Sequence, residues 1–527
     1  MIKGFRQIAI LTSVSRVFGL IRDMSFSHFF GASWLMTAWT MGFKLPNLSR
    51  RLFGEGAAAA SFIPVYSEQL YKDPGEAKQL ANTVVTVLFV LLASIVIVGE
   101  VILLCYYKFF NPNYGTRIGL ALGSIMLPYM ILICIVAILS GILHVHRHFA
   151  RPAAAPIVLN VFIISSILFT GWVLKIKAEH QVFAVASAVL IAGLVQIGIQ
   201  LKPLRENGVS IRPGWQIHCE PFKKIIFLMG PMILGLTVTQ INTLADDLIA
   251  LSFSTEHGYP LGWGAVSYLY YAQRLYQFPL GVLGISLATA IFPVMSAEAA
   301  KGDYESLIGT ISRGIKGAIF ISIPSTVGLI MISRPLVSAV FEHGKFTSAN
   351  TETTAWTLCF YALGLCGYFC QQIATRAFYS MQDSKMPAIT AGVAVIVNII
   401  MNVTLIWFMG TAGLALSTAL CSYLQVIILI RILRRRFGHS IVKGLGTTLL
   451  KTIFATVIMC AVGLVVLGLC RGFGHGKIYE ILRLAVTVPL AAGVYIISSK
   501  LLGIESLSLL TGRKKGENKR AKEIFNG

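Results

Sequence analysis

The chain has 527 residues, of which 56% are hydrophobic and 13% charged, and its mean hydropathy is +0.75. A soluble protein of this length needs far more polar surface to cover its core, so the composition excludes an ordinary cytosolic enzyme. The net charge of +22 does not indicate a nucleic-acid-binding protein, because the basic residues stand in short loops between apolar runs. The chain is therefore expected to be an integral membrane protein.

Apolar runs broken by Gly, Pro or charged residues predict about 14 membrane-spanning helices, each close to the 20 residues that cross a bilayer. The expected spans are 8–30, 34–53, 81–107, 118–143, 153–174, 182–201, 225–252, 264–292, 307–332, 354–380, 387–409, 411–433, 447–470 and 479–503. An even number of spans places both termini on one side. About 32 of the 44 Lys and Arg fall on that side and about 9 on the other, so the positive-inside rule assigns both termini to the cytoplasm.

The two halves of the chain share short patterns. Ala60–Glu68, after the second span, resembles Ala290–Glu298 after the eighth, and a basic, Pro-containing helix start recurs at Arg151 and Lys385. Six helices separate the copies, and an even number predicts a parallel repeat about the membrane normal, with a site between the halves. The expected segments are an N-terminal lobe (1–202), a cytoplasmic linker (203–224), a C-terminal lobe (225–433), two further helices (434–503) and a basic tail (504–527).

The first span carries Arg16, Arg22 and Asp23 where lipid-facing residues should be apolar. A charge at the bilayer centre costs roughly 2.5 to 3.5 kcal/mol, so two arginines that face lipid are disfavoured. The two arginines are six positions apart and therefore about 120° apart around the helix, so both can border one wide cavity. The alternative is that Arg22 pairs locally with Asp23 or extends to the membrane interface.

The second span ends in a segment rich in cations, which contains Lys44, Asn47, Arg50 and Arg51. Pro46 interrupts its hydrogen-bond ladder, so a broken helix end is predicted here. Planar guanidinium groups match phosphate oxygens in a way that ammonium groups do not. The alternative interpretation is an ordinary basic loop on the cytoplasmic side.

In the second half, Arg274 is the one deeply placed arginine of the predicted spans. Three intramembrane arginines with few acids nearby imply an anionic ligand. Asp246 and Asp247 point about 100° apart on a helix, so a cation ligand or an ion pair is favoured over a catalytic carboxylate pair. The sequence has no Walker A loop, GxSxG or HExxH, and so gives no sign of ATP use or hydrolytic chemistry.

Together these residues resemble the MurJ (MviN) family of lipid II flippases, within the multidrug/oligosaccharidyl-lipid/polysaccharide exporter superfamily. The resemblance lies in six stretches dispersed over spans one to eleven, namely 15–23, 43–55, 230–242, 270–284, 343–347 and 378–387. It implies an all-α fold with two six-helix lobes in a parallel pseudo-two-fold repeat, two extra C-terminal helices and a central cationic cavity. Thr37, Gln273 and Gln277 depart from the family pattern, because many or some members have acids at these positions.

The function implied by the resemblance is translocation of lipid II, an undecaprenyl-pyrophosphate-linked disaccharide-pentapeptide, across the bacterial inner membrane by alternating access. No covalent step or cofactor is implied. The expected partners are lipid II and membrane lipids, with other cell-wall synthesis proteins as further candidates. The substrate-binding residues that it implies are Arg16, Arg22, Asp23, Asn47, Arg50, Arg51, Glu55 and Arg274. A sodium site would map to Asp246, Asn398, Asn402 and Thr418, although polar helix packing explains the asparagines equally well.

Besides a binding scaffold for the cell-wall machinery, which would tolerate loss of the arginines, two other functions remain open from the sequence. One is export of drugs or O-antigen-type lipids by a member of the same superfamily, for which an apolar cavity with a single acid would be typical. The other is a membrane transferase or polymerase that acts on the same lipid precursor. Such an enzyme needs a general base and a metal or acceptor site at the membrane face, where the sequence offers only Asp246 and Asp247 within a helix.

Overall fold

The computed structural model describes residues 2–112, 114–438, 441, 444–470 and 476–508. The protein is an all-α polytopic membrane protein. In the described residues, strands are limited to a two-residue pair, β1 (Ser254–Thr255) and β2 (Leu261–Gly262). The chain folds into two compact units. Unit 1 comprises Met1–Gly258, Gly262–Ser267 and His343–Thr347, and unit 2 comprises Tyr259–Leu261, Tyr268–Glu342 and Ser348–Gly527.

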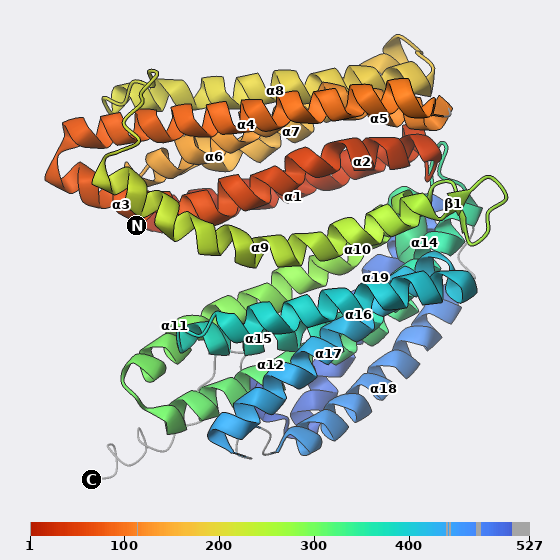
Figure 1. The fold of residues 1–527 in the computed structure, drawn as a ribbon. Helices are drawn as coiled ribbons and strands as arrows, with labels where there is room; N and C mark the ends of the chain where they lie inside the picture. Colours follow the sequence, from red (N-terminus) through yellow and green to blue (C-terminus); the bar gives the residue numbers. More distant parts are fainter. Residues whose placement is uncertain (1, 113, 439–440, 442–443, 471–475, 509–527) are drawn as a thin grey trace. The chain divides into compact units, whose positions relative to one another are not determined.

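Unit 1 is a bundle of long helices that run side by side in one general direction (Figure 1). Its elements are α1 (Ile2–Phe30), α2 (Trp34–Ser49), η1 (Arg50–Gly56), α3 (Ala57–Lys72), α4 (Pro74–Phe110), α5 (Tyr114–Met126), α6 (Tyr129–Val145), α7 (Ala150–Leu168), η2 (Phe169–Val173), α8 (Ala178–Glu206) and α9 (Glu220–Ser252). Helix α1 packs on α7, α2 packs on α5, and α9 packs on α3.

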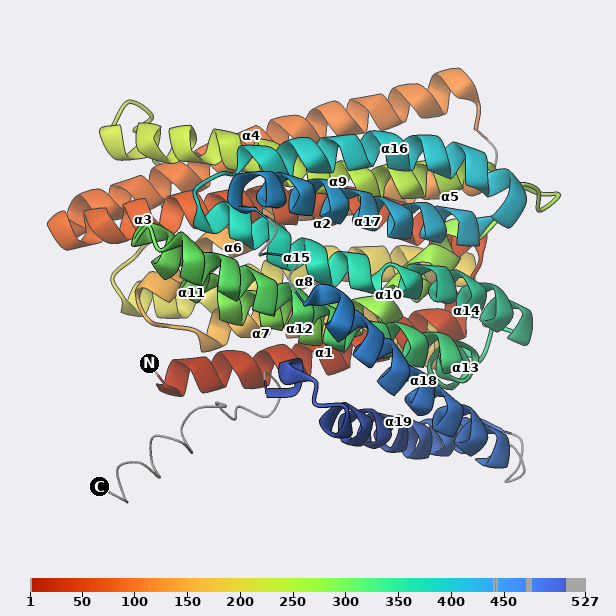
Figure 2. The ribbon, with the colours of Figure 1, turned by 90° about the horizontal axis from the view of Figure 1, so that it is seen from below.

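Unit 2 begins with α10, whose first residues belong to unit 1. Its elements are α10 (Ala265–Pro279), η3 (Leu280–Ile285), α11 (Ser286–Ala300), α12 (Tyr304–Met331), α13 (Ser333–Phe341), α14 (Ser348–Leu363), α15 (Leu365–Ser380), α16 (Lys385–Met409), α17 (Thr411–Phe437), α18 (Leu445–Cys470), α19 (Lys477–Leu501) and η6 (Glu505–Leu507). The two C-terminal helices, α18 and α19, pack against each other, and α18 also packs on α12 (Figure 2).

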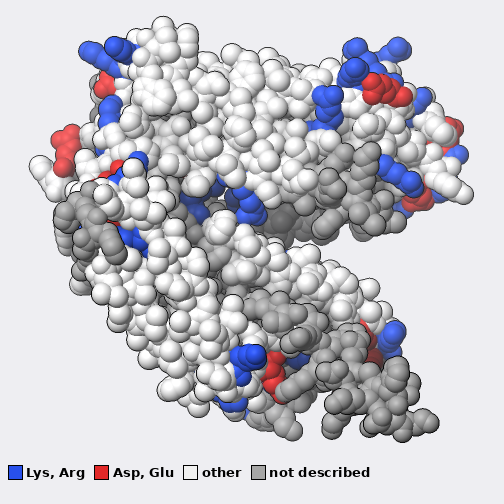
Figure 3. All heavy atoms as spheres, turned by 180° about the vertical axis from the view of Figure 1, so that it is seen from behind, with Lys and Arg blue, Asp and Glu red and all other residues white. Residues whose placement is uncertain are grey.

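Each span expected from the sequence coincides with one helix or with consecutive helices. Eleven of these, among the described residues, are long and apolar enough to cross a membrane. The other three expected spans, α1, α2 and α9, carry the charged residues of interest. Apolar side chains such as Ile97 and Ile102 of α4 are more than half exposed, as expected for a surface covered by lipid. On the face seen in Figure 3, Lys and Arg gather in several patches, with broad uncharged stretches between them.

The order of elements repeats between the two halves. A π-helical segment, η1, follows α2, and another, η3, follows α10. Each leads into a helix of similar length to the one before it, α3 with 16 residues and α11 with 15. The next long helix starts at an aspartate in both halves, Asp73 and Asp303, whose side chains accept hydrogen bonds from backbone N–H groups of the first turn. The resemblance between Ala60–Glu68 and Ala290–Glu298 therefore extends to local structure, because both segments lie in corresponding helices.

The linker between the eighth and ninth helices is short, because α8 continues to Glu206 and α9 starts at Glu220. Helix α9 packs on α3 within unit 1. The Glu68 carboxylate on α3 accepts hydrogen bonds from Lys224 (2.8 Å) and Lys72 (2.7 Å). These bonds and the charges of the two lysines lower the pKa of Glu68 to about 2, so it is ionised at physiological pH and ties α9 to α3.

A short segment from the second half of the chain also belongs to unit 1. The backbone N–H of Lys345 donates to the carbonyl of His28 at 2.9 Å, and the His343 Nε2 lies 3.1 Å from the Met24 carbonyl oxygen. Gly344 has a φ of +61°, and a Cβ at this position would lie 2.3 Å from the His28 oxygen. Only glycine therefore fits, which explains this residue in the His343–Thr347 motif.

The linker contacts α4 and has no regular secondary structure at 209–216, where three polar side chains of α4 hold it. The backbone N–H groups of Arg212, Gly214 and Gln216 donate to Asn82 Oδ1 (3.1 Å), Thr86 Oγ1 (3.0 Å) and Thr83 Oγ1 (3.2 Å). At Gly214, a Cβ would lie 3.0 Å from the Cβ of Asn82, so this close approach requires a glycine or a shift of the chain.

The first prediction concerns this docking. The double variant Asn82→Ala, Thr86→Val removes two of the three acceptors, so the amides of 212–216 should exchange with deuterium about fivefold or more faster, as the loss of about 1 kcal/mol per hydrogen bond implies. Hydrogen–deuterium exchange mass spectrometry measures this rate. The control is Ser94→Ala on the same helix, whose hydroxyl donates to the Val90 carbonyl. Unchanged exchange in the double variant would show that these bonds do not hold the linker.

Candidate functional site

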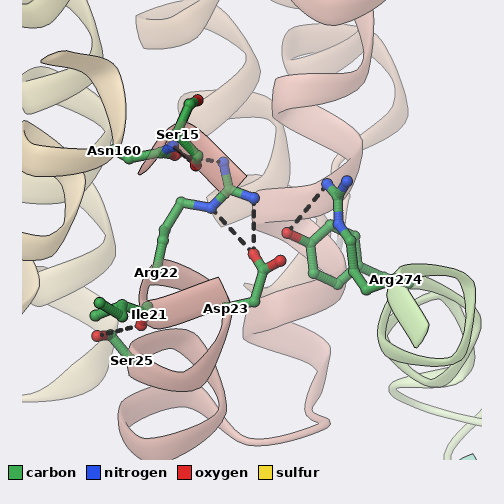
Figure 4. A network of polar contacts seen from close by, with 8 residues as sticks. Ser15, Ile21, Arg22, Asp23, Ser25, Asn160 and Arg274 are labelled. Atoms are coloured by element: carbon green, nitrogen blue, oxygen red, sulfur yellow. Dashed lines mark hydrogen bonds and ion pairs between the residues drawn. The ribbon is translucent and has the colours of Figure 1, made fainter. Parts of the chain in front are cut away.

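Arg22 of α1 forms a polar network inside unit 1. Its Nε and Nη2 donate to the same oxygen, Asp23 Oδ1, at 3.0 and 2.7 Å, and its Nη1 donates to Asn160 Oδ1 of α7 at 3.0 Å (Figure 4). The side chains of Arg22 and Asp23 are 13% and 5% exposed. The local pairing of Arg22 with Asp23, one of the alternatives drawn from the sequence, is present, and Asn160 is an additional partner from another helix.

The packing of α1 on α7 explains how Asn160 reaches Arg22. Ser15, Gly19 and Arg22 lie on one face of α1, because they are four and three residues apart. The Asn160 Nδ2 donates to the Ser15 carbonyl at 3.4 Å, and a Cβ on Gly19 would lie 3.8 Å from that nitrogen. Asn160 therefore contacts this face of α1 at two levels, at the Ser15 carbonyl and at the Arg22 guanidinium. Arg16 is exposed on α1 and does not share this face.

The basic segment after α2 stays helical rather than breaking at Pro46. Helix α2 continues through Pro46 to Ser49, and a π-helical segment, η1, follows directly. The prediction of a broken helix end at Pro46 is therefore wrong, because the helix continues through the proline and its hydrogen-bond pattern changes only at Arg50, where η1 begins. The Arg50 guanidinium donates to Asn47 Oδ1 from Nη2 (3.0 Å) and Nε (3.3 Å), so these two expected site residues lie together.

Two cations of this segment contact α9. The Lys44 Nζ forms an ion pair with Asp247 Oδ2, whose side chain is 6% exposed, and it also donates to the Thr243 carbonyl at 3.3 Å. The Arg51 Nη1 donates to Gln240 Oε1 at 3.2 Å. Asp247 therefore forms an ion pair, one of the two roles expected for the Asp246–Asp247 pair. Its neighbour in the chain, Asp246, is also buried. The side chain of Glu55 lies outside the described part of the structure.

Arg274 is on α10 in unit 2, so its surroundings are described within that unit. Its guanidinium lies over the ring of Tyr270, with Cζ 4.7 Å from the centroid, and its Nη2 donates to the Tyr270 hydroxyl at 3.3 Å. Residue 274 is exposed. A tyrosine one turn earlier on the helix therefore supports the arginine without neutralising its charge.

The asparagines of the expected sodium site form a hydrogen-bonded network between α16 and α17. The Asn402 Nδ2 donates to Asn398 Oδ1 at 2.9 Å, and the Asn398 Nδ2 donates to Ser417 Oγ and Thr418 Oγ1, both at 3.3 Å. Both asparagines are fully buried. Asp246 belongs to unit 1. The contacts match the alternative of polar helix packing, and no cluster of three or more His, Cys, Asp or Glu side chains suited to a metal occurs in the described ranges.

Two positions that depart from the family pattern have polar partners. The Thr37 hydroxyl lies 3.1 Å from the Ser267 hydroxyl, which in turn donates to the Ser33 carbonyl at 3.0 Å. The Gln273 amide donates to the Tyr361 hydroxyl at 3.0 Å. Thr37 and Gln273 are therefore neutral residues that form hydrogen bonds with other neutral groups, where a carboxylate would carry a charge.

Two features of this polar arrangement were not predicted from the sequence, the role of Asn160 and the pairing of Lys44 with Asp247. Asn160 stands alone as a strongly polar residue in the span 153–174, which was the available signal for it. The pairing of Lys44 with Asp247 joins residues 203 positions apart, and no spacing rule connects them.

A family model described as "Lipid II flippase MurJ" matches residues 26–484 of the chain. The chain belongs to the MurJ family of lipid II flippases. A probable lipid II flippase MurJ of Buchnera aphidicola is 30% identical over 96% of this chain and 98% of that protein. A second one, of Vibrio cholerae, is 32% identical over 80% of this chain and 81% of that protein.

Solved structures support the same fold. A structure described as lipid II flippase MurJ in an inward closed conformation has a TM-score of 0.75 at 23% identity, covering 94% of this chain and 98% of that one. An inward-facing multidrug resistance MATE transporter of the MOP superfamily has a TM-score of 0.65 at 16% identity, covering 82% and 98%. The all-α architecture expected from the sequence is confirmed for this MurJ family member.

The second prediction tests the Lys44–Asp247 pair. Asp247→Asn leaves the Lys44 ammonium without its carboxylate in a largely buried position, which should destabilise the fold by roughly 3 to 5 kcal/mol and lower the amount of protein in the membrane. The double variant Lys44→Met, Asp247→Asn should restore that amount, because no charge is left unpaired. Immunoblots of membranes and melting temperatures of the purified variants provide the measurement. Equal losses in the single and double variants would argue against the ion pair as the cause.

Proposed function

We propose that this MurJ family member carries lipid II across the bacterial inner membrane by alternating access, with both termini in the cytoplasm. The family match and the names of the relatives support lipid II as the substrate. As a member of a flippase family the chain is a transporter and not an enzyme, so no covalent step is involved. The observation that carries the proposal is the partly buried guanidinium of Arg22, held by side chains from two helices in a membrane protein.

The chemistry of the substrate explains why arginines suit this role. Lipid II carries a pyrophosphate that must leave water when the headgroup enters the membrane region. Guanidinium groups form paired hydrogen bonds with phosphate oxygens and keep their charge at every physiological pH. We place the pyrophosphate against Arg16 and Arg22 of unit 1, with Asp23 as the partner of Arg22. Arg274 of unit 2 stays a predicted substrate-binding residue. Further contacts with the substrate headgroup are expected from α2 and η1, namely from Asn47, Arg50, Arg51 and Glu55. The lipid tail stays in the membrane.

Two further elements of this proposal follow from the sequence. The basic loops and the tail would contact anionic membrane lipids, because juxtamembrane Lys and Arg are attracted to the cytoplasmic leaflet. A sodium ion held by Asp246, Asn398, Asn402 and Thr418 stays a prediction. Buried Asn398 and Asn402 contribute amide oxygens suited to a hard cation, and those oxygens already accept hydrogen bonds from protein groups.

The third prediction tests the transport function directly. Purified protein in proteoliposomes should make labelled lipid II accessible on the opposite leaflet without changing it chemically, and depletion in cells that lack another flippase should cause lipid II accumulation and lysis. Cationic drugs at excess should not compete, because the arginines repel cations. Competition by drugs would favour the multidrug-type exporter, and a covalent product would favour the transferase. Normal peptidoglycan synthesis in depleted cells would contradict the proposal.

The fourth prediction separates charge from guanidinium geometry. Lys substitution at Arg16, Arg22 or Arg274 keeps the charge but loses the planar fork, so complementation should fall markedly while membrane abundance stays normal. Ala should reduce function further at the exposed Arg16 and Arg274. At Arg22, Ala should also lower abundance, because buried Asp23 loses a partner. Full complementation by all three Ala variants at normal abundance would show that these arginines do not bind the substrate.

A further inference from the structure

We propose that Asn160 of α7 is a positioning residue that fixes the orientation of the Arg22 guanidinium for the substrate pyrophosphate. The inference rests on the proposed function, and it assigns to α7 a part in substrate recognition. Asn160 lies ten residues into α7, about 15 Å along the helix from Ala150, and it is 5% exposed. A primary amide at that depth is costly unless its hydrogen bonds are made, so its partners define its role.

Both ends of the Asn160 amide are used, and both contact α1. The Oδ1 accepts from Arg22 Nη1 at 3.0 Å, and the Nδ2 donates to the Ser15 carbonyl at 3.4 Å. The bond to Ser15 fixes which way the amide points, because it places the nitrogen toward the backbone of α1 and the oxygen toward the guanidinium. Asn160 therefore presents an acceptor, not a donor, to Arg22.

Arg22 is consequently held on two edges by groups from different helices. Asp23, its neighbour in the chain, accepts from Nε and Nη2 on one edge, and Asn160 accepts from Nη1 on another. Because Asp23 is on the same helix as Arg22, a contact with Asp23 alone would not fix the guanidinium relative to any other helix. A second anchor on α7 restricts rotation of the group, and a restricted planar fork loses less conformational freedom when it binds a pyrophosphate.

The neutrality of the amide matters as much as its position. Arg22 and Asp23 together carry no net charge, so a second carboxylate at position 160 would make the group anionic and would repel a phosphate. An asparagine supplies the same acceptor geometry without that charge. The side chain at 160 thus orients the cation and leaves its attraction for an anion in place.

The test is a double-mutant cycle on lipid II binding, measured with the purified full-length protein in lipid nanodiscs. Asn160→Leu has similar volume and no hydrogen-bonding group, and it should weaken lipid II binding about tenfold or more, as expected for the loss of one hydrogen bond to a charged group. A lysine at position 22 has no fork to orient. In the Arg22→Lys background, Asn160→Leu should therefore change binding by no more than about twofold.

A matched control and a second variant separate positioning from general stability. Gln196→Met removes another buried amide of unit 1, which donates to the Ala155 carbonyl of the same α7 and lies on α8, away from the Arg22 contact. It should leave lipid II affinity within about twofold of wild type. Asn160→Gln keeps the amide but displaces it by one methylene, so it should weaken binding like Asn160→Leu and provides the test if the leucine variant does not fold.

Wild-type affinity in both position-160 variants would overturn the positioning role. So would an equal tenfold loss from Asn160→Leu in the wild-type and Arg22→Lys backgrounds. Failure of the wild-type protein to bind lipid II would instead contradict the proposed function, and the two failures are therefore distinguishable.

Discussion

The cost of placing a charge in a low-dielectric environment governs the polar organisation of this protein. A charged side chain within the hydrocarbon region must face protein, water or a ligand, and its bonds must be made. Unit 1 meets this requirement in two places, where Arg22 contacts Asp23 and Asn160 and where Lys44 contacts Asp247. The charged members of these contacts lie on α1, α2 and α9, which are not among the eleven helices of the described residues that are long and apolar enough to cross a membrane.

Helix packing in unit 1 follows from the same requirement. Asn160 reaches Arg22 because α1 packs on α7, where the Asn160 amide also donates to the Ser15 carbonyl. Lys44 can pair with Asp247 only because α9 packs beside α2 and α3, and the surface pair of Lys224 with Glu68 ties the start of α9 to α3. The docking of α9 within unit 1 is thus supported by ionic contacts at two levels of the helix, one buried and one exposed.

The sequence predicted the features that depend on local composition. Apolar length predicted the eleven helices of the described residues that are long and apolar enough to cross a membrane. The unusual charges of the first expected span identified Arg22 and Asp23. Contacts between residues distant in the chain could not be predicted, because a single sequence does not show which face of α7 packs on α1 or that Lys44 pairs with Asp247. Pro46 suggested a break in the helix, but α2 continues through it, and the π-helical segment η1, which packs on α3 and α6, starts only at Arg50. Asn398 and Asn402 were correctly placed on one helical face, and their hydrogen bonds to α17 required the structure.

The central claim is that the Arg22 guanidinium binds the pyrophosphate of lipid II while Asp23 and Asn160 hold it in place. An electron cryo-microscopy structure of the full-length protein with lipid II in nanodiscs tests this claim most directly. Density for the pyrophosphate is expected within hydrogen-bonding distance of the Arg22 guanidinium, with the Asn160 contact retained. Density for the pyrophosphate at another site, beyond hydrogen-bonding distance of Arg22, would contradict it.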